Sequence, residues 1–273
     1  MNESLPILMY HSISDAPEKH ARPYYCTHTS PHIFADQMAW LQQQGYTGVN
    51  LKTGLEMWRC GRVSSTKLVA ITFDDGFRDF FFTAAPILCN VGFSATIFLP
   101  TGFIGSSPKM FKNRQCMTWD EVIKLHRMGF ELGSHTVTHP KMTELPWASV
   151  IEEVRNSKTE LEERLGEPVT SFAYPYAFPQ ADKAYAARFV DLLRREGYRC
   201  NATTSIGRTR ARDNPYLLRR LPVNDYDDHA LLAAKLDGAY DWLAWPQNIF
   251  KRAKLTVQDW RVTYFQQAIN KSA

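Results

Sequence analysis

The chain has 273 residues, of which 44% are hydrophobic and 22% are charged, as is ordinary for a soluble globular protein. The formal net charge of +4 is small for this length, so we expect no nucleic-acid partner. The five cysteines lie far apart, a spacing that fits neither a zinc–thiolate cluster nor a disulfide framework.

Strand-like and helix-like segments alternate along most of the chain. Thr118 and Glu121 form a capping-box pattern at the start of one helix, and Pro86 predicts a break or a first turn in another. The apolar stretch 80–100 is interrupted by proline, asparagine and glycine, so we do not expect it to span a membrane. The expected elements, in chain order, are a strand at 5–10, a helix at 33–44, a strand at 67–73, a helix at 80–92, a strand at 94–100, a helix at 119–129, a strand at 130–135, a helix at 147–165, a strand at 169–176, a helix at 183–197, and strands at 198–204 and 217–223.

Repeated strand-then-helix units favour a parallel α/β architecture. Candidate reactive residues follow several of the expected strands: His11, the pair Asp74 and Asp75, His135, and Tyr176. In parallel α/β folds, reactive groups gather where the strands end. The sequence therefore predicts one site that is built from separate strand ends.

His135 and His139 are four residues apart, so on a helical turn they would share one face and bind a common cation. Two histidines and one carboxylate would leave metal positions open, as catalytic zinc sites require. Either motif alone is more often a surface turn or a helix cap, but both together favour a divalent metal site. Zinc is the default ion, and cobalt, nickel or iron would also suit these ligands. The second carboxylate would then be free to act as a general base.

The segments TFDDG (72–76), HTVTH (135–139) and AYPY (173–176) resemble the motifs of the polysaccharide deacetylases, carbohydrate esterase family four, also called the NodB-homology family. The resemblance implies a distorted (β/α)7-type barrel at 1–225. The less regular pattern of 226–273 predicts a partly helical extension that packs on the barrel. The resemblance also implies metal-dependent removal of N-acetyl groups from amino sugars.

The resemblance assigns roles to individual residues. Asp74 would be the base, and Asp75, His135 and His139 would hold the metal. Thr136 fills the hydroxyl position of the histidine motif. The backbone N–H of the residue after proline, Tyr176, would help to bind the oxyanion.

The chain departs from the family pattern in two places. Ala173 stands where the third motif usually has the arginine that braces the base, and Arg219 or Arg220 is a candidate replacement, with Arg220 preferred. The C-terminal region has no clear L-x-x-H motif, but Leu8 to His11 has this pattern at the N-terminus. As in circularly permuted family members, we expect His11 to be the acid that protonates the leaving amine.

The N-terminus has no signal-peptide pattern, so we expect a cytoplasmic protein that acts on a sugar precursor or a lipid-linked oligosaccharide. The basic and aromatic segment 251–265 suggests peripheral contact with the inner membrane face, although a helix packed on the domain is the preferred interpretation. Two alternatives stay open: the same metal site acting on another amide, and a non-catalytic glycan-binding relative. The sequence does not indicate an oligomeric state.

Overall fold

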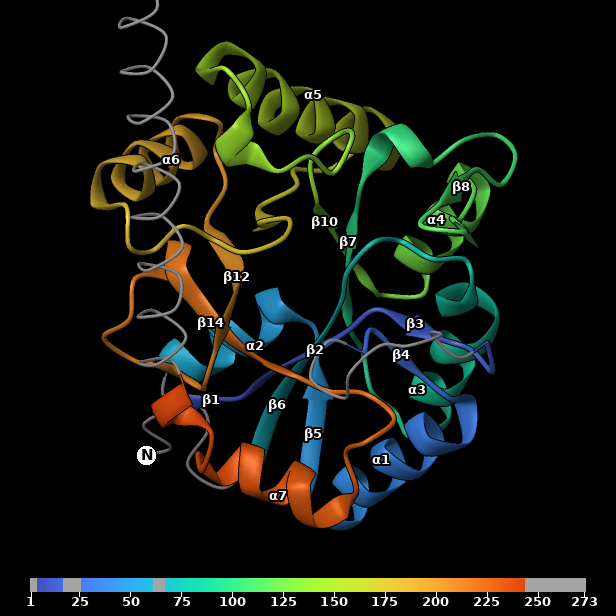
Figure 1. Cartoon of the computed structure of the whole chain (residues 1–273). Coiled ribbons are helices and arrows are strands. Elements are labelled where there is room, and N and C mark those ends of the chain that lie inside the picture. The colour runs from blue at the N-terminus through green and yellow to red at the C-terminus, as the bar shows by residue number, and fades with distance from the viewer. Residues whose placement is uncertain (1–3, 17–25, 61–66, 244–273) are drawn as a thin grey trace, which may run out of the picture.

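The computed structural model of the chain describes residues 4–16, 26–60 and 67–243 (Figure 1). Within these residues, no helix combines the length and the apolar character that crossing a bilayer requires. The segment 251–265 and the expected membrane contact lie outside the described residues, so that expectation stays a prediction.

A closed barrel of seven parallel strands forms the centre of the molecule (Figure 1). The strands follow one another in the order β2, β14, β12, β11, β10, β7 and β6, and β6 pairs with β2 to close the ring. The expected (β/α)7 barrel is thereby confirmed. These strands are β2 (Ile7–Tyr10), β6 (Lys67–Phe73), β7 (Thr96–Leu99), β10 (Glu131–Ser134), β11 (Ser171–Ala173), β12 (Cys200–Ile206) and β14 (Leu218–Pro222).

An additional strand, β5 (Tyr46–Val49), distorts the ring. Ala70 of β6 pairs with Ile7 of β2 on one edge of β6 and with Val49 of β5 on the other edge. Two residues further on, Thr72 pairs with Thr96 of β7 on that same edge. The strand β6 therefore changes partner along its length.

Helices surround the barrel, and their starts follow local sequence signals. The expected capping box of α4 is present, because Thr118 and Glu121 each accept the backbone N–H of the other. The expected first turn at Pro86 is present, because Pro86 is the second residue of α3. The helices are α1 (Pro31–Gln43), α2 (Leu51–Arg59), α3 (Ala85–Asn90), α4 (Trp119–Arg127), α5 (Trp147–Leu165), α6 (Lys183–Arg195) and α7 (His229–Asp237). A π-helical segment at Phe80–Ala84 precedes α3, and single 3-10 turns lie at Thr101–Phe103, Met142–Glu144, Pro215–Leu217 and Asp241–Leu243.

Three small two-stranded pairs lie outside the barrel sheet. They are β1 (Ser4–Leu5) with β13 (Thr209–Arg210), β3 (Ser12–Ile13) with β4 (His28–Thr29), and β8 (Met110–Phe111) with β9 (Arg114–Gln115). The last pair is an antiparallel hairpin whose two turn residues, Lys112 and Asn113, both have a positive φ. This is the turn type that matches the twist of a hairpin.

Alternate residues of the strands belong to two separate cores. Val69 and Ile71 pack with the surrounding helices, whereas Leu68 and Ala70 belong to a second cluster on the opposite face of the strand. The second cluster lines the barrel interior, and Leu51 of α2 is part of it. The Leu51 N–H also donates to Thr96 Oγ1 at the start of β7, so α2 covers the N-terminal end of the barrel. The C-terminal end of the barrel is formed by the loops that follow the strands.

The sequence analysis missed β5 and α2. Both are short and contain glycine, and Gly48 lies where an added Cβ would meet the ring of Phe93 at 2.4 Å. The glycine thus serves close packing, which a propensity argument does not detect. After β14, helix α7 contributes Leu232 and Leu236 to the outer core, and the expected domain boundary near residue 225 stays a prediction.

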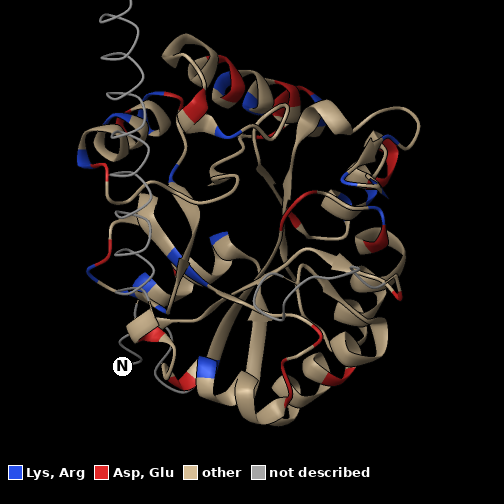
Figure 2. Ribbon diagram, in the orientation of Figure 1, with Lys and Arg blue, Asp and Glu red and all other residues tan. Residues whose placement is uncertain are grey.

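Charged residues of both signs are interspersed on the outer helices, most visibly on α5 (Figure 2). A surface of mixed charge agrees with the small net charge of the chain.

Candidate active site

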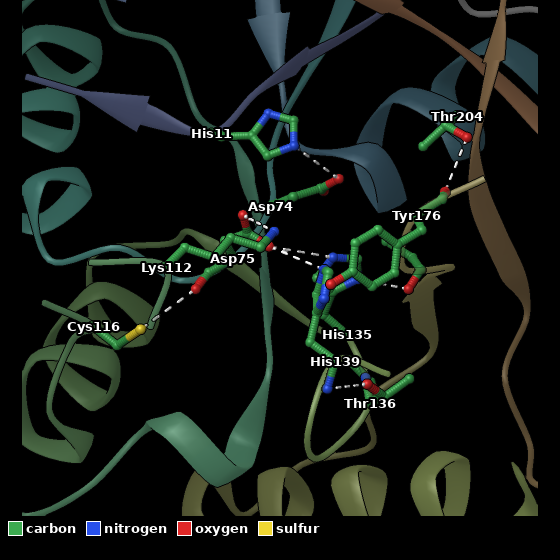
Figure 3. A network of polar contacts seen from close by, with 12 residues as sticks. His11, Asp74, Asp75, Lys112, Cys116, His135, Thr136, His139, Tyr176 and Thr204 are labelled. Carbon is green, nitrogen blue, oxygen red and sulfur yellow. Dashed lines mark hydrogen bonds and ion pairs between the residues drawn. The ribbon is translucent and has the colours of Figure 1, made fainter. Parts of the chain in front are cut away.

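The candidate site residues lie at the carboxyl ends of the barrel strands. His11 follows β2, Asp74 and Asp75 follow β6, His135 follows β10, and Tyr176 lies three residues after β11. Because parallel barrel strands end on one face, these side chains converge on a common space (Figure 3).

Backbone conformation marks the same region. In the described part of the chain, six residues other than glycine have a positive φ: Asp75, Lys112, Asn113, Thr136, His139 and Tyr176. Such conformations are unfavourable for residues with a Cβ and persist where the surrounding structure enforces them, often at functional sites. All six lie in the loops that carry or border the candidate site.

Asp75, His135 and His139 form a compact group whose ligand atoms lie within 4.8 Å of one another. Asp75 Oδ1 lies 3.2 Å from His139 Nε2 and 3.7 Å from His135 Nε2. All three side chains are buried, and Asp75 Oδ1 has no hydrogen-bond partner among the residues that the structure describes. A buried, unpaired carboxylate oxygen between two imidazole nitrogens is unfavourable in the protein alone and fits a bound cation.

The orientation of His135 fits the same role. Its Nδ1–H donates to the carbonyl oxygen of Ala173 at 2.7 Å, which leaves Nε2 with its lone pair directed to the site. A hydrogen bond of this kind fixes the tautomer of a metal-binding histidine. Burial lowers the pKa of His135 to about 3, so its imidazole is neutral, as metal binding requires.

The loop 135–139 is not the helical turn that the spacing of the two histidines suggested. Positive φ values of 68° at Thr136 and 54° at His139 interrupt helical geometry. Thr136 Oγ1 accepts the His139 N–H at 3.0 Å, and Glu153 of α5 accepts two further N–H groups of the loop at 2.8 and 2.9 Å. These bonds bring the histidine rings to a centroid distance of 4.7 Å without a helix.

Arg220 reaches Asp74 from the last barrel strand. Its Nη1 and Nη2 donate to Asp74 Oδ1 and Oδ2, both at 2.7 Å, and its Nε donates to the Thr203 carbonyl at 3.0 Å. The Arg220 side chain is 0% exposed. Arg219, the other candidate, has its Nε 4.0 Å from Asp213 and is partly exposed. Of the two arginines, only Arg220 lies against the carboxylate that lacks the usual brace.

The environments of the two neighbouring acids differ. Burial alone would raise the pKa of Asp74, but the Arg220 guanidinium outweighs it and lowers this pKa to about 2. Burial opposes ionisation of Asp75 as well, but His139 and the Lys112 ammonium outweigh it and hold its pKa below the ordinary value. Both acids are therefore ionised at neutral pH, and only Asp75 faces the two histidines.

His11 joins the site through the closure of the barrel. Its Nε2 lies 4.0 Å from Asp74 Oδ2, although the two residues are far apart in the sequence. Burial lowers the pKa of His11 against the opposing effect of Asp75 and Asp74. A protonated His11 would therefore give up its proton readily.

Tyr176 has φ 54° and is 47% exposed at the edge of the site. Its ring meets the His139 ring at a centroid distance of 4.7 Å, and its carbonyl accepts the Thr204 hydroxyl at 3.0 Å. Its own N–H donates to none of the residues that the structure describes. That N–H is thus available as a donor next to the buried histidines.

Lys112, in the turn of the β8–β9 hairpin, is a site residue that the sequence analysis missed. Its Nζ donates to Asp75 Oδ2 at 2.9 Å and lies 5.6 Å from the centre of the Tyr176 ring (Figure 3). The only sequence signal was Asn113, since asparagine tolerates the positive φ of such a turn. A lysine in that turn has no recognisable motif.

Comparisons with known proteins give one consistent result. A sequence model of the family described as polysaccharide deacetylase matches residues 61–201. The Bacillus subtilis (strain 168) protein YxkH, provisionally named as a polysaccharide deacetylase, is 28% identical over 225 residues, which are 81% of this chain and 71% of that protein. The poly-beta-1,6-N-acetyl-D-glucosamine N-deacetylase of Staphylococcus aureus (strain MSSA476) is 23% identical over 217 residues, which are 76% of this chain and 71% of that protein.

Solved structures agree on the fold. The Streptococcus pyogenes deacetylase PplD, in complex with acetate, superposes with a TM-score of 0.74 and 23% identity, over 85% of this chain and 98% of that one. IcaB from Ammonifex degensii gives a TM-score of 0.70 at 24% identity, over 86% and 97% of the two chains.

Proposed function

The chain belongs to the polysaccharide deacetylase family, and from this premise we propose that it is a metal-dependent hydrolase that removes N-acetyl groups from an amino-sugar glycan. The observation that carries the proposal is that two adjacent buried acids have different partners. Asp75 Oδ1 faces the Nε2 atoms of His135 and His139, whereas Asp74 is held apart by Arg220.

Asp75, His135 and His139 would hold the divalent ion, and the ion would supply a Lewis acid for a water molecule and for the amide carbonyl. Zinc is the first choice for two imidazoles and one carboxylate, and cobalt, nickel or iron would also fit. Asp74 would take the proton of the attacking water, and its bidentate contact with Arg220 keeps it ionised and fixed in place.

Two further groups complete the proposed chemistry. The unbonded N–H of Tyr176 would donate to the oxygen that becomes negative as the amide carbon turns tetrahedral. His11 would give a proton to the leaving amine nitrogen, which could not depart as an amide anion. The 4.0 Å between His11 Nε2 and Asp74 Oδ2 supports an acid and a base that act side by side.

The substrate class follows from chemistry and from relatives. The Staphylococcus aureus relative is named for a polymer of N-acetylglucosamine, and we extend an N-acetylated amino-sugar glycan to this chain as a proposal, with a lipid-linked oligosaccharide as one form of it. The missing arginine of the third motif had suggested a non-catalytic relative. Arg220 at 2.7 Å from Asp74 removes that reason.

Acetate release from N-acetylglucosamine oligomers tests the proposal. We expect Asp74→Asn to lower turnover by about 10²- to 10⁴-fold, because the base is lost, while metal per chain stays unchanged. Asp120→Asn on the exposed first turn of α4 is the matched control and should keep full turnover. Metal binding by the wild type without acetate release from any oligomer would contradict the proposed activity.

A further inference from the structure

The two oxygens of Asp75 have different partners. Oδ1 faces His139 and His135 at 3.2 and 3.7 Å from their Nε2 atoms, whereas Oδ2 accepts a hydrogen bond from Lys112 Nζ at 2.9 Å. A free carboxylate is able to bind a cation through one oxygen or through both. In this site, one of the two oxygens is already engaged by a cation of the protein.

Several contacts fix the Lys112 ammonium at this place. Besides Asp75 Oδ2, it lies over the Phe111 ring at 4.8 Å and over the Tyr176 ring at 5.6 Å from the ring centres. Cation–π contacts of this kind hold an ammonium in a defined position. The side chain is nevertheless 40% exposed, so it stands between the buried ligand group and the solvent.

Backbone hydrogen bonds join the hairpin that carries Lys112 to the residues that directly follow Asp75. The Arg78 N–H donates to the Gln115 carbonyl at 2.8 Å, and the Met117 N–H donates to the Gly76 carbonyl at 3.1 Å. The two-residue turn sets the position of Lys112 relative to these strands. Backbone hydrogen bonds thus connect the hairpin of Lys112 to the loop of Asp75.

We propose that Lys112 is a positioning residue that reserves Asp75 Oδ2, so that Asp75 offers a single oxygen to a divalent ion. This inference rests on the proposed function. A catalytic ion needs coordination positions for water and for the substrate carbonyl. A second carboxylate oxygen would occupy one of them, and the ammonium prevents this. Its positive charge also opposes the binding of the divalent ion. The site would therefore bind the ion less tightly but leave one more of its coordination positions open.

Cobalt(II) is a suitable probe, because its visible absorption reports how many ligands surround it. We expect Lys112→Met to bind Co²⁺ about tenfold more tightly than the wild type, since a repelling charge is lost and a second oxygen is freed. Its visible absorption should become weaker as the coordination number rises, and kcat should fall with little change in KM. Lys112→Arg keeps the charge and the hydrogen bond, and it should restore the wild-type affinity and spectrum.

Lys109→Met is the matched control, because Lys109 lies just before the same hairpin but donates to the Gly102 and Ile104 carbonyls. It should leave the cobalt spectrum unchanged. Unaltered or weaker Co²⁺ affinity of Lys112→Met, with the wild-type spectrum, would overturn the role of Lys112 alone. Failure of the wild type itself to bind Co²⁺ would instead overturn the proposed metal site, and the inference with it.

Discussion

At the scale of single residues, the site depends on how a buried charge is compensated. Asp74 is almost fully buried, which alone would favour its neutral form. Arg220 supplies two short charge-assisted hydrogen bonds and is itself bonded to the Thr203 carbonyl and to Thr72 Oγ1. The carboxylate therefore stays charged although it is buried, and in this form it can serve as a base.

Removal of Arg220 should be severe for stability. Arg220→Met leaves the Asp74 charge buried without a partner, so we expect a loss of about 3–5 kcal/mol in the free energy of unfolding at neutral pH. Urea denaturation measures this loss. The double variant Arg220→Met with Asp74→Asn should recover part of it, because the unpaired charge is then absent. Equal stability of Arg220→Met and the wild type would contradict the buried ion pair.

The same ion pair predicts a dependence on pH. The pKa of Asp74 is about 2 in the folded protein against 3.8 as its ordinary value, so this group contributes about 2 kcal/mol of stability above pH 4. That contribution should be lost as the pH falls from about 4 to 2. In Arg220→Met, burial instead raises the pKa of Asp74 above its ordinary value. The difference in the free energy of unfolding between the variant and the wild type should therefore begin to shrink above pH 4, as the variant's Asp74 takes up its proton, and should shrink further toward pH 2. Unfolding midpoints in urea between pH 7 and pH 3 follow this change, and a constant deficit would contradict it.

At the scale of elements, helix α4 and the loop after Asp75 stabilise each other. Thr118 caps α4 together with Glu121, and Glu121 also accepts from Arg78 at 2.7 and 2.9 Å. Arg78 follows Asp75 by three residues, so the first turn of α4 helps to fix the position of the loop that carries Asp75. The capping box was predictable from spacing alone, but its connection to Arg78 was not.

Loss of the cap should affect stability more than chemistry. We expect Thr118→Ala to lower the free energy of unfolding by about 1 kcal/mol in urea denaturation, because the Glu121 N–H loses its acceptor. Thr159→Ala in the exposed middle of α5 is the control and should be neutral or slightly stabilising. A neutral Thr118→Ala would show that the capping box contributes nothing measurable.

At the scale of the whole molecule, closure of the barrel determines which residues meet. Strand β2 at the N-terminus pairs with β14 on one side and with β6 on the other. Three segments distant in the sequence therefore bring His11, Asp74 and Arg220 to one face. A chain in which this ring failed to close would keep every motif and lose the site.

His11 provides a test of that closure. His11→Ala should fold normally but lose most of its turnover, because the other described histidine that acts on Asp74, His135, is a proposed metal ligand and is not free to protonate the leaving amine. Circular dichroism and acetate release measure the two properties. His126→Ala on α4 is the control, since His126 pairs with Glu167 outside the barrel. Near-full turnover of folded His11→Ala would contradict its role as the acid.

The sequence predicted the features that depend on local pattern. Alternating segments indicated a parallel α/β architecture, the resemblance to the deacetylases implied the barrel, and strand ends indicated where Asp75 and His135 would lie. The sequence left Arg219 and Arg220 as candidates for the arginine that binds Asp74, with Arg220 preferred. Side chains alternate between the two faces of β14, so only one of the two arginines faces Asp74. The sequence analysis missed Lys112, because a hairpin of four paired residues places this lysine against a residue 37 positions away. Such a contact depends on tertiary packing and has no local signature.

Metal-dependent activation measures the central claim most directly. Protein stripped with a chelator should release no acetate from N-acetylglucosamine oligomers, and turnover should rise in proportion to added Zn²⁺ or Co²⁺ until one equivalent per chain is reached. His139→Ala, which removes one proposed ligand, should show no such endpoint. Full acetate release by the stripped protein, or wild-type activation without a one-to-one endpoint, would contradict a single ion bound by Asp75, His135 and His139.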